Sequence, residues 1–416
     1  GPVRHRCTWW WSEDVRAAVE EKRLAYRKWL QSRLDEDLAR YRVARRKAKR
    51  CVAKAQAGER EKWRASLSEP AGQKRVFAMA RRMAREGRDV SGVPCVRAES
   101  GRVIVEGDEM KEVWARYWSR LLNEENPWDG GQGSAPVEGP ELSVSASEIE
   151  FALRAMKRGK AAGPSGLVAE MLVAGGPFLN GWFTSLCDLI WRTGEIREDW
   201  ALSVLVPVFK GKGDPLSCGS YRPIKLMEHG MKVMERVLER RLRAVVSVDG
   251  MQCGFMSGKS TTDAIFLVRQ LQEKYLDKRR SLWCMFVDLE KAYDRVPREL
   301  VRWALRLKGV TEELVRVVMP MYVGSHSLVR TSVGETRSFD VGVGLHQGSV
   351  LSPLLFAVVM DEVVREVKVG MPWEVLFADD LVLLAQTREL FARYRAWKNA
   401  MMGSGLKVNV VKTKVV

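Results

Sequence analysis

The sequence has little of what several common protein classes require. Its 4 histidines form no pair at metal-binding spacing, and its 7 cysteines are scattered, odd in number and never arranged as Cys-x-x-Cys. This argues against a disulfide framework or a zinc ribbon and indicates free thiols in a reducing compartment. No apolar run approaches the length of about 20 residues that spans a bilayer, and no signal peptide opens the chain, so we expect no membrane partner.

Positive charge is what the sequence has in excess. The 416 residues carry 69 Lys and Arg against 52 Asp and Glu, a formal net charge of +17. Residues 1–90 alone hold 25 basic against 12 acidic side chains. This imbalance indicates a polyanionic partner, and it predicts a basic arm ahead of a body that is closer to neutral.

A dense basic run lies at residues 40–54, within a stretch that is rich in helix formers. Two interpretations stay open. The run is either the solvated face of a helix or a surface that binds a phosphate backbone, and the overall charge favours the second. The side chains concerned are Arg45, Arg46, Lys47, Lys49 and Arg50.

Carboxylates stand at the ends of two apolar strands. Asp379 and Asp380 separate the apolar runs 375–378 and 381–385, which read as two buried strands joined by a tight turn. A third apolar run, 282–287, ends in Asp288. Unpaired carboxylates at such positions are costly unless a cation neutralises them. Two strands that deliver carboxylates to one sheet edge can hold a pair of divalent cations roughly 4 Å apart, the arrangement used in phosphoryl transfer.

The order of the predicted elements indicates an α+β protein. Residues 126–140 are rich in Gly and Pro and form the best linker in the chain. Beyond it, residues 203–209 alternate as a strand that returns through residues 221–225, and strands are expected near 327–333 and 336–343. Because helices and strands do not alternate strictly, we expect helices packed on one face of a mostly antiparallel sheet.

Four runs, in this order along the chain, resemble motifs A to D of reverse transcriptases. They are Phe286-Val-Asp-Leu-Glu-Lys-Ala-Tyr-Asp294, Gly344-Leu-His-Gln-Gly-Ser-Val-Leu-Ser-Pro353, Phe377-Ala-Asp-Asp380 and Gly405-Leu-Lys-Val-Asn-Val-Val-Lys-Thr-Lys414. Together with Gly254-Phe-Met-Ser-Gly258 and the Ser-Thr-Thr-Asp that follows at residues 260–263, they are most similar to non-LTR retrotransposons of the RTE-like group. The resemblance covers roughly residues 145–416, and the Trp-rich start at Trp9, Trp10 and Trp11 more loosely.

The resemblance implies a right-hand polymerase with an antiparallel palm sheet backed by helices. Its parts would be a basic helical extension at 1–90, a loop and linker region with a short helix at 91–140, fingers with the first palm helices at 141–280, and the palm at 281–416. Relatives carry an endonuclease upstream and a primer-grip hairpin and thumb downstream. The chain begins with Gly-Pro and leaves no room for these parts, so we expect a fragment of a longer polypeptide.

The resemblance also assigns the chemistry. Two Mg²⁺ ions, with Mn²⁺ as a substitute, would activate the primer 3′-hydroxyl and clamp the triphosphate. A motif D lysine would protonate the pyrophosphate as a general acid, and Lys407 and Lys414 compete with Lys412 for that role. The assigned metal-binding and catalytic residues are Asp288, Leu289, Asp379, Asp380 and Lys412.

Further residues would hold the substrates. Tyr293 matches the aromatic residue that clashes with a ribose 2′-hydroxyl and so favours dNTPs. Lys210 or Lys212 would meet the triphosphate with Arg222, because a mobile ammonium and a planar guanidinium both suit phosphate oxygens. Glycines of the motif B loop would let its backbone approach the incoming base and template. The remaining assignments are Gln347 and Gly348 to the nucleotide, and Lys259 and Ser349 to the nucleic acid.

Two functions follow from these patterns. The first is an RNA-directed DNA polymerase that extends a DNA primer or target-DNA 3′-hydroxyl with dNTPs on an RNA template. The second is a palm–fingers fragment that only binds nucleic acid. An RNA-dependent RNA polymerase is disfavoured, because such enzymes usually place Gly and an acidic residue where this chain has Ala378 and Tyr293. The resemblance implies residence in the nucleus, and in the cytoplasm during ribonucleoprotein assembly.

Overall fold

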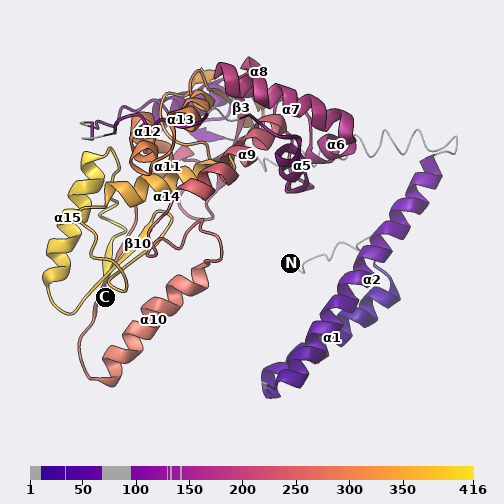
Figure 1. The fold of residues 1–416 in the computed structure, drawn as a ribbon, viewed down its shortest axis with the longest axis horizontal. Helices are drawn as coiled ribbons and strands as arrows, with labels where there is room; N and C mark the ends of the chain where they lie inside the picture. Colours follow the sequence, from indigo (N-terminus) through magenta and orange to yellow (C-terminus); the bar gives the residue numbers. More distant parts are fainter. Residues whose placement is uncertain (1–10, 33, 68–94, 129, 132–133, 141–142) are drawn as a thin grey trace. The chain divides into compact units, whose positions relative to one another are not determined.

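The computed structural model describes residues 11–32, 34–67, 95–128, 130–131, 134–140 and 143–416 (Figure 1). The chain divides into two compact units, residues 1–89 and 90–416. Trp9 and Trp10, which belong to the Trp-rich start, lie outside the described residues. Within the described ranges, no helix is both long enough and apolar enough to span a membrane.

The first unit contains a helical hairpin of α1 (Glu13–Ser32) and α2 (Asp35–Leu67). Small side chains form its seam, because Ala18 of α1 and Ala44 and Ala48 of α2 are all buried. Near the turn, the rings of Trp29 and Tyr41 stack with their centroids 6.1 Å apart and an angle of 5° between their planes. The basic run therefore lies on a long helix whose seam is occupied by alanines.

The second unit begins with a short hairpin of β1 (Val96–Arg97) and β2 (Val103–Ile104), followed by α4 (Gly107–Leu121). Aromatic side chains of α4 lie in the core, because Trp114 and Trp118 are buried. They pack in a small cluster with Tyr221 and Val329 from the neighbouring sheet. This part of the unit is thereby attached to the strands that follow.

A helical layer and the first sheet come next. Ser145 begins α5 with a capping box, its hydroxyl accepting from the Glu148 N–H and the Glu148 carboxylate accepting from the Ser145 N–H. The strand β3 pairs antiparallel with β4 and parallel with β6, and β6 also pairs with β7 and β8. The bounds are α5 Ala146–Arg154, α6 Ala169–Ala174, α7 Gly176–Thr193, α8 Glu198–Ala201, β3 Leu202–Phe209, β4 Tyr221–Leu226, α9 His229–Val245, β6 His326–Thr331, β7 Gly334–Glu335 and β8 Phe339–Asp340.

The second sheet carries the acidic strand ends. Its strands are antiparallel in the order β11 (Lys414–Val415), β5 (Trp283–Val287), β10 (Asp380–Ala385) and β9 (Glu374–Phe377). Leu381 pairs with Val287. One step farther along each strand, this register brings Asp380 opposite Asp288. The predicted convergence of two acidic strand ends at one sheet edge is confirmed by this pairing.

Helices cover one face of this sheet. Met285, Val287, Leu381 and Leu383 are buried and share the main core with α14 (Ser352–Val363), of which ten of the twelve residues are buried. Phe286 points to the other face and is 43% exposed. Figure 1 shows α10 beyond β10, on the side away from α14. The remaining bounds are α10 Thr261–Asp277, α11 Ala292–Arg295, α12 Arg298–Leu307, α13 Glu312–Val318 and α15 Glu389–Gly403. The α+β class with an antiparallel palm sheet is confirmed, but the sheet is not covered on one face alone, because α10 lies beside the face that carries Phe286 and Val382.

Candidate active site

Three carboxylates meet at the edge of the second sheet. Asp288 follows β5, Asp379 lies in the turn between β9 and β10, and Asp380 opens β10. Burial raises the pKa of the Asp379 carboxyl, and repulsion from Asp380 and Asp288 raises it further. Burial also raises the pKa of Asp380, with Asp288 adding to the effect. The structure therefore brings the predicted triad close enough for its members to disfavour one another's negative charge.

A lysine partly neutralises this cluster. Lys412 Nζ lies 2.6 Å from Asp288 Oδ2. The loop that carries it is tied to the same strand end, because the Asn409 N–H donates to the Asp288 carbonyl over 2.8 Å. Of the two competing lysines, Lys407 pairs with Glu290 at 3.4 Å, and Lys414 is built into β11. The geometry therefore favours Lys412 as the lysine at the reactive carboxylates.

The donor set suits a divalent cation of the Mg²⁺ or Mn²⁺ type. Among the described residues, no three His, Cys, Asp or Glu side chains are gathered closely enough to hold a metal ion in this conformation. One reason is that Asp288 is turned toward Lys412. The chemistry nevertheless fits, because hard carboxylate oxygens are the ligands that Mg²⁺ and Mn²⁺ select. Bound divalent charge would also relieve the repulsion that raises the pKa values of Asp379 and Asp380.

A cavity of about 950 Å³ opens in front of these carboxylates. Its walls come from the β3–β4 hairpin on one side and from the end of β5, the motif B loop and the Lys412 loop on the other. Asp380 lines a different, apolar cavity beside α10. The predicted residues that the large cavity brings together are Lys210, Lys212, Arg222, Asp288, Leu289, Tyr293, Gln347, Gly348, Asp379 and Lys412. The Leu289 side chain is buried, so only its main chain could serve a metal.

Cations converge on this cavity. Burial lowers the pKa of Lys210, and repulsion from Lys291, Lys412 and Arg222 lowers it further. Lys210 Nζ donates to the Gly219 carbonyl over 2.8 Å. Sequence reasoning missed Lys291, which lines the same cavity and follows the acidic Asp288-Leu-Glu290 run. Four basic side chains close enough to repel one another form a site that suits a polyphosphate.

Tyr293 stands between the core and the cavity. Its ring stacks on Phe356 with the centroids 4.5 Å apart and an angle of 16° between the planes. Burial raises the pKa of its phenol far above the usual value, and the Asp379 charge contributes. Its hydroxyl has no hydrogen-bond partner among the described residues. A ring held by stacking therefore forms part of the cavity wall.

The motif B loop packs on the first sheet. The Lys225 N–H donates to the Gln347 carbonyl over 2.7 Å, and Gln347 Nε2 donates to Asp294 Oδ1 over 2.8 Å. Gly348 has φ +130°, and a Cβ on it would lie 2.3 Å from the Lys225 carbonyl oxygen. The close approach that requires glycine here is to β4. The sequence interpretation assigned it instead to the incoming base and template.

Two residues assigned to the nucleic acid are engaged within the protein. Ser349 is buried, and its hydroxyl donates to Glu235 Oε1 over 2.5 Å while accepting from the Leu351 and Ser352 N–H groups at the start of α14. The Ser349 side chain is therefore part of the core, and only its main chain is left for the predicted contact with the nucleic acid. Lys259 Nζ donates to the carbonyls of Gly250, at 2.6 Å, and Gln252, at 3.0 Å, and so braces that loop.

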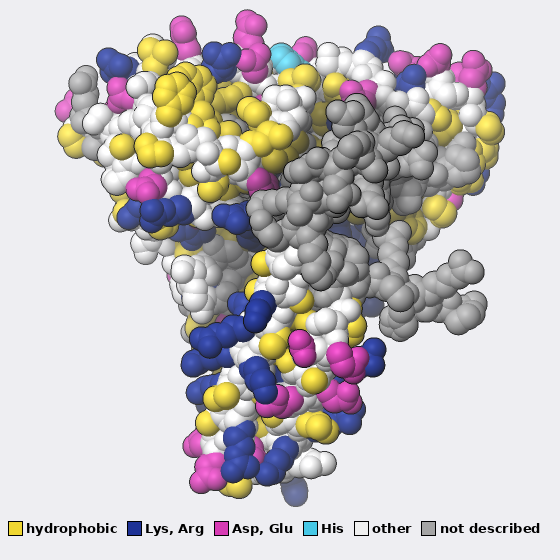
Figure 2. All heavy atoms as spheres, turned by 90° about the vertical axis from the view of Figure 1, so that its right-hand side faces the viewer, with side chains coloured by type: hydrophobic (Ala, Val, Ile, Leu, Met, Phe, Trp, Pro, Cys, Tyr) yellow, Lys and Arg dark blue, Asp and Glu magenta, His cyan; other side chains and the backbone are white. Residues whose placement is uncertain are grey.

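The basic run forms a stripe on α2. Arg45, Arg46, Lys49 and Arg50 are exposed, and none of them forms an ion pair with another described side chain. Lys47 differs, because its Nζ lies 2.7 Å from Glu21 Oε2 of α1, and this bond raises its pKa. Figure 2 shows Lys and Arg side chains along the hairpin. Four unpaired like charges on one helix face repel one another, and a bound polyanion would remove that repulsion.

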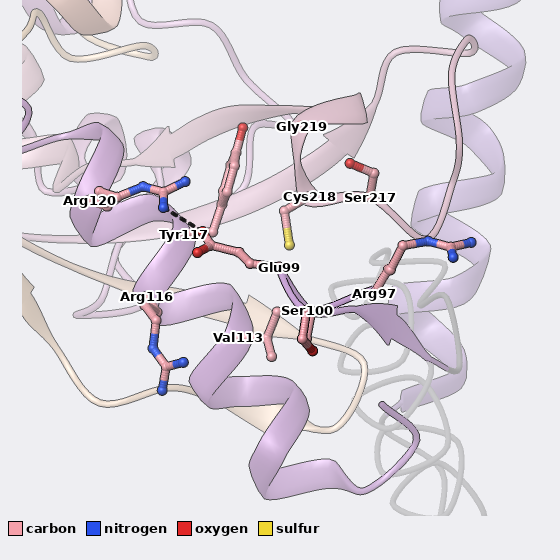
Figure 3. A pocket seen from close by; sticks show the side chains of 11 residues that line it. Arg97, Glu99, Ser100, Val113, Arg116, Tyr117, Arg120, Ser217, Cys218 and Gly219 are labelled. Atoms are coloured by element: carbon pink, nitrogen blue, oxygen red, sulfur yellow. Dashed lines mark ion pairs between the residues drawn. The ribbon is translucent and has the colours of Figure 1, made fainter. Parts of the chain in front are cut away.

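A second cavity, of about 320 Å³, lies between the β1–β2 hairpin, α4 and the β3–β4 connection (Figure 3). Three arginines line it, but each is paired with a carboxylate. Arg120 lies 2.6 Å from Glu99, Arg97 lies 3.2 Å from Asp214, and Arg116 lies 3.6 Å from Glu112. With its arginines paired and no member of the acidic triad on its walls, this cavity is not the candidate active site.

Comparison with known proteins gives one consistent family. Residues 210–416 match the family model described as reverse transcriptase (RNA-dependent DNA polymerase). The chain is 29% identical over 259 residues to the Pol polyprotein of the type-1 retrotransposable element R2 of Nasonia vitripennis, covering 59% of this chain and 24% of that protein. It is 25% identical over 236 residues to the RNA-directed DNA polymerase from mobile element jockey of Drosophila melanogaster, covering 52% of this chain and 24% of that protein.

A further relative matches a larger share of the chain. Over 321 residues the chain is 24% identical to the transposon TX1 149 kDa protein of Xenopus laevis, covering 71% of this chain and 24% of that protein. The chain thus spans about a quarter of the length of these relatives. A structure of apo telomerase from Candida tropicalis, truncated from its C-terminal domain, matches with a TM-score of 0.41 and 12% identity over 57% of this chain and 55% of that one.

Proposed function

The chain carries a reverse transcriptase domain of the non-LTR retrotransposon type, and from this premise we propose that it extends a DNA 3′-hydroxyl with dNTPs on an RNA template. The observation that carries the proposal is a single cavity with an acidic wall and a basic wall. Asp288 and Asp379 line it together with Lys210, Arg222 and Lys412. The RTE-like subgroup and residence in the nucleus are parts of the proposal that rest on the motif forms alone.

The acidic wall would hold the metal. Reverse transcriptases, like other polymerases, use divalent metal ions, and Asp288, Asp379 and Asp380 are the residues that would bind two Mg²⁺ ions here. Such ions activate the attacking hydroxyl and stabilise the leaving oxygen. Of the three carboxylates, Asp380 is held directly by antiparallel pairing, since it opens the β10 strand that pairs with β9 and β5, while Asp288 and Asp379 adjoin strand ends. Strand-borne ligands are positioned more tightly than ligands on loops.

The basic wall would hold the triphosphate. Arg222 lies on β4, while Lys210 and Lys212 lie in the connection from β3 to β4, where Gly211 and Gly213 both have positive φ. Lys210 is the stronger candidate of the two lysines, because it is half-buried next to Lys291, Lys412 and Arg222. Lys412, which contacts Asp288, would donate a proton to the leaving pyrophosphate.

Selection of the sugar would rest on Tyr293. Its ring is fixed by stacking on Phe356, so it cannot move aside to admit a ribose 2′-hydroxyl without losing that contact. A clash of this kind disfavours rNTPs without adding any attraction for dNTPs. The proposal therefore predicts DNA synthesis rather than RNA synthesis.

The α2 stripe would hold nucleic acid. Arg45, Arg46, Lys49 and Arg50 lie at positions i, i+1, i+4 and i+5 of α2, so they line one side of the helix with a rise of about 6 Å per four residues. A row of unpaired cations at this spacing can follow a phosphate backbone. RNA template and primer or target DNA are both polyanions of this kind.

Primer extension tests the proposal. An RNA template annealed to a DNA primer is incubated with the chain, Mg²⁺ and dNTPs, and the product is sequenced. A product complementary to the template, absent with Asp379→Asn and present with Asp340→Asn, supports the proposal; Asp340 offers an exposed carboxylate for the matched control. Salt-sensitive RNA binding without extension would favour a module that only binds nucleic acid.

A further inference from the structure

The turn that presents the catalytic carboxylates is held in an unfavourable backbone conformation. Ala378, directly before Asp379, has φ +59°. This left-handed region is costly for a residue with a Cβ and persists only where the surroundings impose it. The two-residue hairpin loop requires a positive φ at this position, and because an alanine adopts it at a cost, a contact from outside β9 and β10 would stabilise the turn.

The stabilising group is the side chain of Gln252. Its Oε1 accepts from the Ala378 N–H over 3.0 Å and from the Gly254 N–H over 2.9 Å. Gln252 is completely buried, so water cannot replace these bonds. The two donors require an oxygen at this position, which orients the amide. Its Nε2 has no hydrogen-bond partner within the described part of the chain.

The segment around Gln252 is itself built into the sheet. The Cys253 N–H donates to the Leu376 carbonyl over 2.7 Å, and the Leu376 N–H donates to the Met251 carbonyl over 2.9 Å. Gly254 lies directly against the turn, because a Cβ on it would come within 2.2 Å of the Ala378 nitrogen. The segment that carries Gln252 therefore runs parallel to the end of β9 and reaches the turn.

We propose that Gln252 is a positioning residue for the metal-binding carboxylates, which it acts on by fixing the left-handed conformation of Ala378. The inference rests on the proposed function of Asp379 and Asp380. Gln252 touches neither substrate nor metal in this role. It sets the direction in which the chain leaves β9, and hence where the Asp379 carboxylate points.

A role in packing alone would give a different result. Gln252→Met keeps the length of the side chain and its burial but removes the acceptor. If packing were the whole role, the variant would lose stability without changing the site. If the acceptor fixes the turn, the Ala378 N–H of Gln252→Met has lost its partner and exchanges its hydrogen with solvent more rapidly, and the carboxylates lose their alignment. Glycine tolerates positive φ without strain, so Ala378→Gly added to Gln252→Met should recover part of the loss.

The experiment compares wild type, Gln252→Met, the double variant with Ala378→Gly, and Thr336→Val as the matched control. Thr336 is likewise buried, and its hydroxyl accepts from the Val329 N–H over 2.9 Å, but Val329 belongs to β6 of the first sheet. Three quantities are measured: hydrogen exchange of the peptide that covers residues 375–381, Mn²⁺ affinity by electron paramagnetic resonance, and the Mg²⁺ concentration for half-maximal primer extension. Gln252→Asn, which withdraws the amide by one methylene, replaces Gln252→Met if the latter does not fold.

We expect Gln252→Met to accelerate exchange in this peptide and to weaken Mn²⁺ binding by about 10- to 100-fold, with a matching rise in the Mg²⁺ requirement. The double variant should regain part of the affinity, and Thr336→Val should change none of these quantities. Unchanged exchange and Mn²⁺ affinity in Gln252→Met would overturn the inference while leaving the proposed function intact. Failure of wild type to bind Mn²⁺ through Asp379 would overturn both.

Discussion

Gly348 offers the sharpest test of how the motif B loop is built. Its φ is +130°, and a Cβ added to it would lie 2.3 Å from the Lys225 carbonyl oxygen, so Gly348→Ala meets two obstacles together. The dihedral alone costs about 1–3 kcal/mol. Moving the loop off β4 adds about 1–3 kcal/mol of packing strain. The hydrogen bond from the Lys225 N–H to the Gln347 carbonyl is then strained as well.

Two other glycines separate these contributions. Gly159 has φ +69° with open space around its Cβ position, so Gly159→Ala reports the dihedral cost alone. Gly181 lies within α7 with neither a positive φ nor a neighbour within 4 Å, so Gly181→Ala should stabilise the protein by about 0.5–1 kcal/mol.

Thermal unfolding followed by circular dichroism measures the three variants. We expect Gly348→Ala to lose about 3–5 kcal/mol and to lower the Tm by roughly 5 °C, with a loss of about 1–2 kcal/mol for Gly159→Ala and a small gain for Gly181→Ala. A Gly348→Ala loss no larger than that of Gly159→Ala would refute the reasoning. The contact between the loop and β4 would then be too soft to require glycine.

Three further predictions concern Tyr293, Asp294 and the α2 stripe. Tyr293→Ala should raise the use of rNTPs relative to dNTPs by roughly 10-fold or more, whereas Tyr293→Phe, which keeps the ring, should not; unchanged selectivity in Tyr293→Ala would exclude the gate. Burial raises the pKa of Asp294 to about 6 from 3.8, so its folded form binds the proton more tightly than the unfolded chain. The contribution of this group to the free energy of unfolding should therefore be fully present below about pH 4 and should fall by as much as about 3 kcal/mol as pH rises through 6. Urea unfolding at several pH values should show this decrease in wild type and not in Asp294→Asn. Replacing the four cations of the α2 stripe with Gln should lower the slope of log K against log salt concentration for single-stranded RNA binding by up to about 2.8. The same change at four ion-paired surface arginines should leave the slope nearly unchanged. Equal slopes in the two variants would show that the stripe does not contact the RNA. The stripe residues are Arg45, Arg46, Lys49 and Arg50, and the control residues are Arg154, Arg192, Arg197 and Arg302.

The acidic edge could be predicted because local signals and sheet geometry agree there. Short apolar runs ending in Asp288 and in the Asp379–Asp380 pair identify strands, and antiparallel pairing brings such ends together. The capping box at Ser145 and the core stripe on α4 were predictable for the same reason. In each case the signal lies within a few residues of the feature.

Contacts between distant segments could not be predicted in this way. Gln252 lies 126 residues before Ala378, and nothing in its own neighbourhood marks it as the acceptor for that N–H. Ser349 sits in a loop that reads as functional, yet its partner is the buried Glu235 on α9. The need for glycine at Gly348 arises from the Lys225 carbonyl on another strand. The parallel pairing of β3 with β6 joins strands more than 100 residues apart, and the hydrophobic periodicity that predicts a strand does not predict which strand it pairs with.

The rate of adding one dNTP to a DNA primer on an RNA template tests the central claim most directly. Wild type, Asp379→Asn and Asp340→Asn are compared at saturating Mg²⁺, with thermal unfolding as a check on folding. We expect Asp379→Asn to slow the addition by about 10³-fold, or about 4 kcal/mol of transition-state stabilisation, and Asp340→Asn to leave it unchanged. A folded Asp379→Asn that adds the nucleotide at the wild-type rate would contradict the assignment of this cavity as the polymerase site.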